Sequence, residues 1–276
     1  MITVIPYMGL GNRIRCIRSA IRLANAKKTS LKIIWINDEV CPCDFCELFK
    51  EIQGAKYGIK IKNYKLRNRK YWLLNRDLKG FFKLLYYIFF INGKMNRLIY
   101  DTILYEPDYK QILQEDLSHQ KNVLIRSYSE FFVNNDYVQF NFATQIEDTA
   151  SQVMDNRECI GIHIRQGDNR EAIQYSPMYL FIDVMESIIK EKPDACFYVS
   201  SDEKKALQCI IEKFPNKCIY YKEKSWDRVT KAGQFSAAVE LVCLSRTKII
   251  YGSYWSSFSE EAAKLGNINK VVLKLY

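Results

Sequence analysis

Apolar residues follow two alternating patterns along the chain, most regularly after residue 145. Short apolar runs, which are typical of buried strands, occur at 159–164, 196–200, 218–221, 248–251 and 271–273. Between these runs, apolar residues recur at helical spacing and predict helices at 177–190, 203–214, 234–244 and 256–265. Because strands that alternate with helices form parallel sheets with right-handed crossovers, this half is expected to be a Rossmann-type nucleotide domain.

The first half begins with the same alternation. Apolar runs at 2–6 and 31–36 predict two strands, and a third strand is expected at 123–125. The expected fold class is therefore α/β. We expect one domain at 1–145 and a second domain at 146–276.

A glycine-containing stretch, Gly9-Leu10-Gly11-Asn12-Arg13, separates the first strand from the helical pattern that follows. Glycines let the backbone approach a ligand, and a helix N-terminus offers N–H groups to an anion. The third glycine of the dinucleotide fingerprint is missing, so an ordinary strand-to-helix turn is the alternative. The arginines of this helix are expected on its solvent face, with the first near enough to the loop to reach an anion: Arg13, Arg15, Arg18 and Arg22.

Composition narrows the class of protein. Of the 276 residues, 48% are hydrophobic and 26% are charged, which is ordinary for a soluble globular enzyme. Lys and Arg number 41 against 31 Asp and Glu, and the net charge of +10 favours a nucleotide, nucleic acid or anionic membrane as partner. No signal-peptide pattern precedes the first strand, so a cytoplasmic location is expected.

The nine cysteines are scattered through expected helices, strands and one loop. This scatter favours buried, reduced thiols over a disulfide framework. Cys41, Cys43 and Cys46 stand close together, but no second cysteine pair or nearby histidine supplies the fourth ligand of a closed zinc site. No metal is therefore expected.

Residues 65–97 are basic, with aromatic residues between the charges, and they enclose the most apolar run of the chain at 81–91. Its eleven residues are too few for the ~30 Å hydrocarbon core of a membrane, which takes about twenty. The run is expected to form a buried helix or an amphipathic helix on an anionic membrane surface. No nucleic-acid-binding motif accompanies the basic residues, so nucleic acid is not an expected partner.

A polar cluster ends the strand at 159–164: His163 lies within it, and Arg165 and Asp168 follow it. Ligands of open α/β sheets bind at the carboxyl ends of strands, and a guanidinium there suits a phosphate. Asp168 can orient this arginine or take part in proton transfer. The alternatives are a surface ion-pair cluster and, for His163, a hydrogen-bonded core position.

Three stretches, at 9–13, 163–168 and 252–263, together resemble the α-1,2/α-1,6/protein O-fucosyltransferase superfamily, which includes the rhizobial nodulation fucosyltransferases. Segments 44–49 and 198–202 are weaker matches. The resemblance implies a GT-B arrangement, with two Rossmann-like domains facing a cleft. It also implies metal-independent, inverting transfer of fucose from GDP-fucose, with no cofactor.

The resemblance also implies roles for residues of the second half. Arg165 would bind the β-phosphate of the donor and stabilise the leaving GDP. His163 and Glu240 would lie against guanine or ribose. Without the resemblance, Glu240 is expected to be a solvated carboxylate of a helix.

Ser256 and Ser257 would offer hydroxyl and N–H donors to the phosphates at a helix N-terminus. An ordinary helix cap is the alternative for these serines. Three residues of the first domain would face the cleft: Gly11, Asn12 and Arg13.

Sugar transfer also needs a base for the acceptor hydroxyl, and Asp168 and Glu171 are the two candidates. Two positions depart from the family's pattern. Gln166 stands where a second arginine is common, and Ile173 stands where the base of α-1,6 enzymes is proposed.

The function expected is a cytoplasmic glycosyltransferase that moves fucose from GDP-fucose to a glycan or lipid-linked saccharide. Peripheral contact with an anionic membrane is expected through 65–97. One alternative is a glycosyltransferase with another nucleotide sugar as donor. The other is a noncatalytic protein of the same fold that binds anions or nucleic acid.

Overall fold

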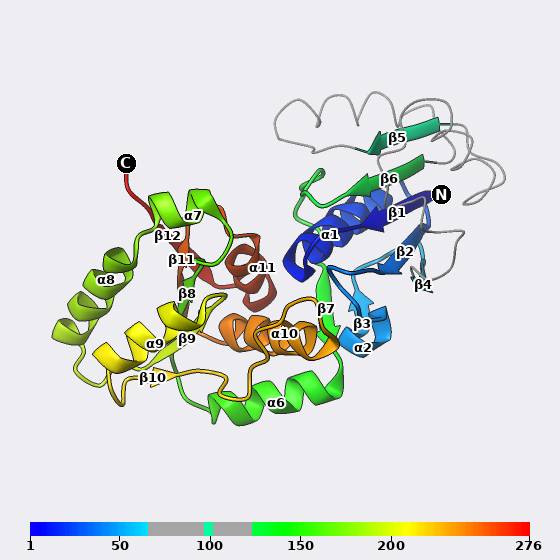
Figure 1. The fold of residues 1–276 in the computed structure, drawn as a ribbon. Coiled ribbons are helices and arrows are strands. Elements are labelled where there is room, and N and C mark those ends of the chain that lie inside the picture. The colour runs from blue at the N-terminus through cyan, green and yellow to red at the C-terminus, as the bar shows by residue number, and fades with distance from the viewer. Residues whose placement is uncertain (66–96, 102–122) are drawn as a thin grey trace. The chain divides into compact units, whose positions relative to one another are not determined.

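The computed structural model describes residues 1–65, 97–101 and 123–276, which fall into two compact units, Met1–Asn141 and Phe142–Tyr276 (Figure 1). Each unit contains a five-stranded sheet in which all paired neighbours run parallel. The α/β class predicted from the alternation of strands and helices is therefore confirmed.

The second unit has the strand order β10-β9-β8-β11-β12. In chain order this is the arrangement 3-2-1-4-5 of a Rossmann sheet, and the order reverses between β8 and β11. Each strand corresponds to a predicted apolar run. Their bounds are Ile160–Ile164 (β8), Phe197–Ser201 (β9), Cys218–Ile219 (β10), Ile249–Ser253 (β11) and Asn269–Leu273 (β12).

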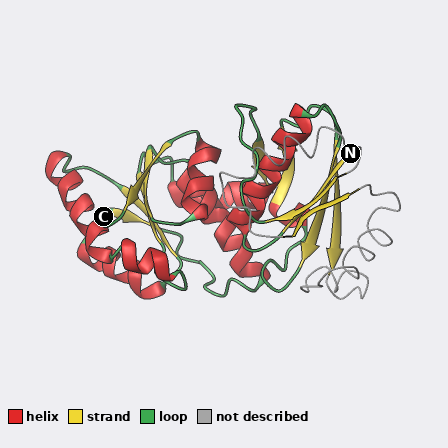
Figure 2. Cartoon of the chain, turned by 90° about the horizontal axis from the view of Figure 1, so that it is seen from above, coloured by secondary structure: helices red, strands yellow, loops and turns green. Residues whose placement is uncertain are grey.

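Helices cover both faces of this sheet (Figures 1 and 2). Ile162 and Val199 pack with α8 and α9 in one core. Because side chains alternate along a strand, His163 projects to the other face, where it stacks on Phe258 of α11. α10 packs on that same face, against α6 and α11. The helix bounds are Thr144–Met154 (α6), Met178–Glu191 (α8), Lys204–Lys213 (α9), Lys231–Ser245 (α10) and Ser257–Gly266 (α11).

The first unit has the strand order β4-β2-β1-β6-β5, with β1 in the centre. β3 and β7 form a separate two-stranded sheet. The strands are Ile2–Pro6 (β1), Leu31–Asn37 (β2), Phe49–Gln53 (β3), Ile59–Lys65 (β4), Arg97–Asp101 (β5), Val123–Ser127 (β6) and Gln139–Phe142 (β7). Among its described residues, the helices are Leu10–Ala26 (α1) and Phe45–Leu48 (α2).

The arginines of α1 do not form the predicted solvent face. Arg13 and Arg18 are buried. Arg15 Nε donates to Tyr128 O at 2.8 Å, and Arg18 Nη1 donates to Val138 O at 2.7 Å. The prediction is wrong for Arg15 and Arg18 because the irregular segment before β7 packs on this side of the helix, and these two arginines bind its backbone carbonyls. Arg13 binds the carbonyls of Met8 and Ile36 instead.

Most of the basic segment 65–97, including the apolar run at 81–91, lies outside the described residues. The buried or membrane-surface helix expected there stays a prediction. Across the ranges that the structure does describe, every helix is too short or too polar to cross a bilayer. Among the cysteines, Cys46 and Cys209 are exposed, so the expectation of buried thiols is wrong for these two.

Candidate functional site

The candidate site lies at the carboxyl edge of the second sheet, where the strand order reverses. The chain leaves β8 at Arg165 and ends β11 at Ser253, whose Oγ accepts a hydrogen bond from Arg165 N at 2.9 Å. Ligands of open α/β sheets bind at such a reversal. The polar cluster noted in the sequence therefore occupies the edge position best suited to a ligand.

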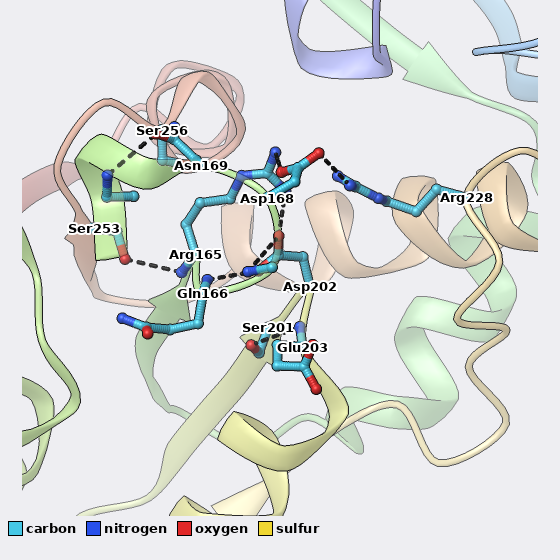
Figure 3. Close-up of polar contacts among 12 residues, drawn as sticks. Arg165, Gln166, Asp168, Asn169, Ser201, Asp202, Glu203, Arg228, Ser253 and Ser256 are labelled. Carbon is cyan, nitrogen blue, oxygen red and sulfur yellow. Dashed lines mark hydrogen bonds and ion pairs between the residues drawn. The ribbon is translucent and has the colours of Figure 1, made fainter. Parts of the chain in front are cut away.

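Two carboxylates hold the Arg165 guanidinium (Figure 3). Nη1 contacts Asp202, and Nη2 contacts Asp168. Asp202 Oδ1 also accepts hydrogen bonds from Gln166 N at 2.8 Å and Gly167 N at 3.1 Å. A Cβ on Gly167 would lie 2.6 Å from Asp202 Oδ2, so glycine permits this close approach. The Arg165 side chain remains 21% exposed, which leaves the fixed guanidinium open to solvent.

Asp202 was not among the predicted site residues, although it ends segment 198–202, one of the weaker matches to the resembling family. It does not cap the helix that follows. Glu203 is the N-cap of α9, and its side chain accepts a hydrogen bond from Lys205 N. A usable signal was present, since Asp202 directly follows β9, the neighbour of β8, and adjacent parallel strands end at the same sheet edge.

Arg228, in the loop before α10, was not among the predicted site residues. Its Nη2 donates to Asp168 Oδ2 at 2.8 Å (Figure 3). Burial acts to raise the pKa of Asp168, but the positive charges of Arg165 and Arg228 outweigh it and hold the pKa below its usual range. Asp168 is therefore ionised at neutral pH and shared by two cations.

His163 is buried within β8. Its ring stacks on Phe258 with the centroids 5.2 Å apart, and Nδ1 lies 3.4 Å from Ser256 Oγ. Burial, followed by the positive charges of Arg165 and Lys270, lowers the His163 pKa well below its usual value. The ring is therefore neutral at pH 7, in the hydrogen-bonded core position considered as the alternative.

Glu240 is buried on α10 and forms an ion pair with Lys224, with Nζ 2.6 Å from Oε2. Lys224 Nζ also donates to Ser201 O, at 2.5 Å, which places the pair beside the last residue of β9. Burial raises the pKa of Glu240, although Lys224 acts in the opposite direction. The alternative of a solvated helix carboxylate is wrong, because α10 buries this side chain at the sheet edge.

Ser256 and Ser257 lie at the N-terminus of α11. Ser256 is the N-cap and is buried, but its side chain makes no capping hydrogen bond. Its Oγ lies near His163 instead. Ser257, the first helical residue, is partly exposed. The N–H groups of this first turn add partial positive charge beside β11.

Glu171 is partly exposed in the first turn of α7 (Arg170–Tyr175), a helix that the sequence patterns did not predict. Asn169 caps this helix by accepting a hydrogen bond from Ala172 N at 3.1 Å. Its Nδ2 donates to Trp255 O at 3.1 Å. Asn169 therefore ties the loop after β8 to the loop after β11.

The three candidates from the first unit lie at the start of α1. Gly11 is buried and Asn12 partly exposed. Arg13 is completely buried: it donates to two backbone carbonyls, at 2.6 and 2.8 Å, and its Nη2 lies 2.8 Å from Asp38 Oδ2. These partners engage the guanidinium within the protein. The expected contact between Arg13 and a substrate is therefore corrected, and Arg13 is a structural residue.

Positive charge at the site comes from two guanidiniums and a helix N-terminus. Guanidiniums bind phosphate oxygens with charge-assisted hydrogen bonds, and helix N-termini also favour anions. Within residues 1–65, 97–101 and 123–276, no three His, Cys, Asp or Glu side chains are grouped so that they could hold a metal ion. The two guanidiniums and the helix N-terminus can bind an anion such as a phosphate.

No protein-family model matches the sequence, and no curated protein matches it. Solved structures do share the fold. The α-1,6-fucosyltransferase NodZ, co-crystallised with GDP, has a TM-score of 0.57 at 16% identity, with 94% of this chain and 91% of that chain covered. NodZ from Bradyrhizobium gives the same values.

FUT1 of Arabidopsis thaliana, as a point mutant in complex with GDP, has a TM-score of 0.61 at 15% identity, covering 99% of this chain and 69% of that chain. POFUT1 in complex with GDP has a TM-score of 0.56 at 12% identity and covers 99% and 98% of the two chains. The chain therefore has the fold of these fucosyltransferases, in agreement with the resemblance noted in the sequence.

Proposed function

We propose that this protein is a glycosyltransferase that transfers fucose from GDP-fucose to a saccharide, with inversion at the anomeric carbon. The observation that carries the proposal is the Arg165 guanidinium, fixed at the strand-order reversal of a Rossmann sheet and open to solvent. Crystal structures of the same fold are described with GDP or GDP-fucose. These neighbours support the same donor here.

In the proposed reaction the acceptor hydroxyl attacks the anomeric carbon, a base takes its proton, and the bond to the β-phosphate oxygen breaks. GDP leaves with the electrons of that bond. Arg165 would stabilise the charge on this leaving group, with the N–H groups at Ser256 and Ser257 as further donors. These groups can neutralise the phosphates themselves, so the proposed mechanism requires no metal ion.

The candidate bases differ in their surroundings. A general base works best when its pKa lies near the operating pH, whereas two guanidiniums lower the pKa of Asp168. Glu171, in the first turn of α7, forms none of these ion pairs. We therefore propose that Asp168 serves as the ion-pair partner of the two arginines and that Glu171 is the base.

We propose that the nucleoside lies along the same sheet edge, near His163 and Glu240. The carboxylate of Glu240 can accept hydrogen bonds from the N–H groups of guanine or from ribose hydroxyls. In the GT-B arrangement, Gly11 and Asn12 would face the donor from the other domain. That arrangement is part of the proposal.

The proposed acceptor is a glycan or lipid-linked saccharide, and the proposed location is cytoplasmic, at the inner membrane face. The net charge of +10 supports contact with an anionic surface. Segment 65–97 would make that contact. Flotation with anionic and neutral vesicles tests it, and equal recovery with both kinds of vesicle would contradict it.

The first test is a calorimetric and thermal-shift panel of GDP, UDP, CMP and ADP in EDTA. A ligand at 100 times its dissociation constant stabilises the fold by about 2.7 kcal/mol. We expect GDP to bind selectively and Arg165→Ala to abolish binding. Arg246→Ala is the matched control, since Arg246 is ion-paired with Glu147 elsewhere in the same unit.

The other outcomes separate the alternatives. Binding of UDP in place of GDP would keep the glycosyltransferase and change the donor. The noncatalytic alternative would be supported if no nucleotide bound and if RNA binding were steeply salt-dependent and unchanged in Arg165→Ala. If GDP binds, release of free fucose from GDP-fucose without an acceptor tests turnover.

A further inference from the structure

The Asp168 carboxylate lies between two guanidiniums that come from distant parts of the chain (Figure 3). Oδ1 contacts Arg165 and Oδ2 accepts from Arg228. One carboxylate with an arginine on each oxygen has the charge pattern of a phosphate held by two arginines. The two guanidiniums are therefore already arranged around an anion.

The loop that carries Arg228 is held firmly against α10. Arg228 O accepts a hydrogen bond from Gln234 Nε2 at 2.5 Å, and Thr230 caps the helix through Gly233 N. A Cβ on Gly233 would lie 1.9 Å from Asp227 O, so glycine is required for this approach of loop to helix. The backbone at Arg228 is thus fixed while half of its side chain stays exposed.

The two carboxylates bound to Arg165 differ in how easily they could leave. Asp202 is 8% exposed and also accepts hydrogen bonds from Gln166 N and Gly167 N. Asp168 is 62% exposed, and within the described residues its only ion-pair partners are the guanidiniums of Arg165 and Arg228. Losing Asp202 would disrupt the loop after β8, whereas Asp168 can move into water.

We propose that Arg228 is a second phosphate-binding residue and that a diphosphate displaces Asp168 from between Arg165 and Arg228. This inference rests on the proposed function, because it assigns Arg228 to the diphosphate of the same donor. It also explains how the site can lack an arginine at Gln166, the position where a second arginine is common in the resembling family. Gln166 Nε2 donates to Ser176 O at 2.9 Å, and the second guanidinium comes from the loop before α10 instead.

Arg165 is proposed to act on the β-phosphate of the donor, and Arg228 shares the Asp168 carboxylate with Arg165, so both guanidiniums would meet the β-phosphate, which GMP lacks. The contribution of Arg228 should therefore appear for ligands with two linked phosphates. It should be small for GMP and absent for guanosine. This difference separates phosphate binding from a general effect on folding.

The test is the dissociation constant of GDP, GMP and inorganic pyrophosphate for wild type, Arg228→Ala and Arg228→Lys. We expect Arg228→Ala to weaken GDP and pyrophosphate at least tenfold, to change GMP less than threefold, and to be partly rescued by Arg228→Lys. The control is Arg157→Ala, an exposed arginine paired with Asp155. Unchanged GDP and pyrophosphate binding in Arg228→Ala, with loss in Arg165→Ala, would overturn the inference and leave the proposed function intact.

Asp168→Asn tests displacement directly. If Asp168 competes with the diphosphate, this variant should bind GDP several-fold more tightly than wild type. Asp183→Asn, an exposed carboxylate on α8, controls for the loss of one negative charge. Weaker GDP binding in Asp168→Asn would mean that Asp168 positions the arginines, and the displacement would be disproved. Wild type that binds neither GDP nor pyrophosphate would refute both the inference and the proposed function.

Discussion

An arginine lies in the first turn of α1 in the first unit, and another lies directly after β8 in the second unit. Arg13 follows β1, and Arg165 follows β8; each strand is the central strand of its sheet. Arg13 is 0% exposed and Arg165 is 21% exposed. Both arginines follow the central strand of a parallel sheet, yet one guanidinium is sealed inside the protein and the other reaches solvent.

The partners of the two arginines explain their different roles. Arg13 donates to two backbone carbonyls and pairs with Asp38, whose Oδ1 is itself bonded to Cys41 N at 2.9 Å. None of these groups can leave without unfolding the local structure. Arg165 has Asp168 as a largely exposed partner that a ligand could replace. An arginine at a strand end is a binding candidate only when one of its partners can be exchanged.

The largest expected effect is the loss of stability in Arg13→Leu. The substitution leaves the Asp38 carboxylate buried without its cation, and breaking a buried ion pair costs about 3–5 kcal/mol. Urea unfolding at neutral pH measures this change in the free energy of unfolding. The folded fraction should keep the GDP affinity of wild type.

The double variant Arg13→Leu/Asp38→Asn is the control for this experiment. Asparagine keeps an oxygen for Cys41 N and removes the unpaired charge, so part of the lost stability should return. If Arg13→Leu lost GDP affinity but kept its stability, Arg13 would be a ligand-binding residue like Arg165.

A smaller effect is expected from His163, on the strand that leads to Arg165. Its pKa is lowered in the folded protein by burial and nearby positive charge, so below about pH 6.5 the unfolded chain binds a proton that the folded chain does not. Stability should therefore fall as the pH drops from 6.5 toward the folded pKa, by up to about 1.4 kcal/mol per pH unit.

His163→Gln should flatten this part of the stability curve, measured by urea unfolding between pH 7.5 and 5. His119→Gln is the control for the removal of a histidine that titrates, because His119 is the other histidine of the chain. An unchanged pH slope in His163→Gln would show that His163 takes up its proton equally well in the folded protein.

Local patterns were enough to predict most of the second unit, but in the first unit they missed β3, β4, β5 and β7. Each strand of the second sheet is a short apolar run whose neighbours in sequence supply the covering helices, and the polar residues after β8 mark its carboxyl edge. Arg165 could be found in this way, because its position depends on the strand that precedes it. α7 was missed because its six residues show no clear helical period.

Contacts between residues far apart in the sequence could not be predicted in the same way. Arg228 reaches Asp168 across 60 positions, and Arg15 reaches Tyr128 across 113. Such pairs depend on how loops pack on helices, which hydrophobic periodicity does not report. The sequence could therefore supply Arg165 as a candidate, but it could not distinguish its exchangeable partner from the fixed partners of Arg13.

The smallest expected effect on stability is that of Asp168→Asn. Exposed ion pairs contribute about 0–1 kcal/mol, because water already solvates both charges and salt screens them. Asp168 is 62% exposed and Arg228 49% exposed, so urea unfolding should show a loss within this range. The contribution is present above the unfolded pKa of about 3.9 and disappears as the pH falls through the lowered folded pKa. A loss as large as that of Arg13→Leu would make Asp168 a structural anchor like Asp38, and the two strand ends would then be alike.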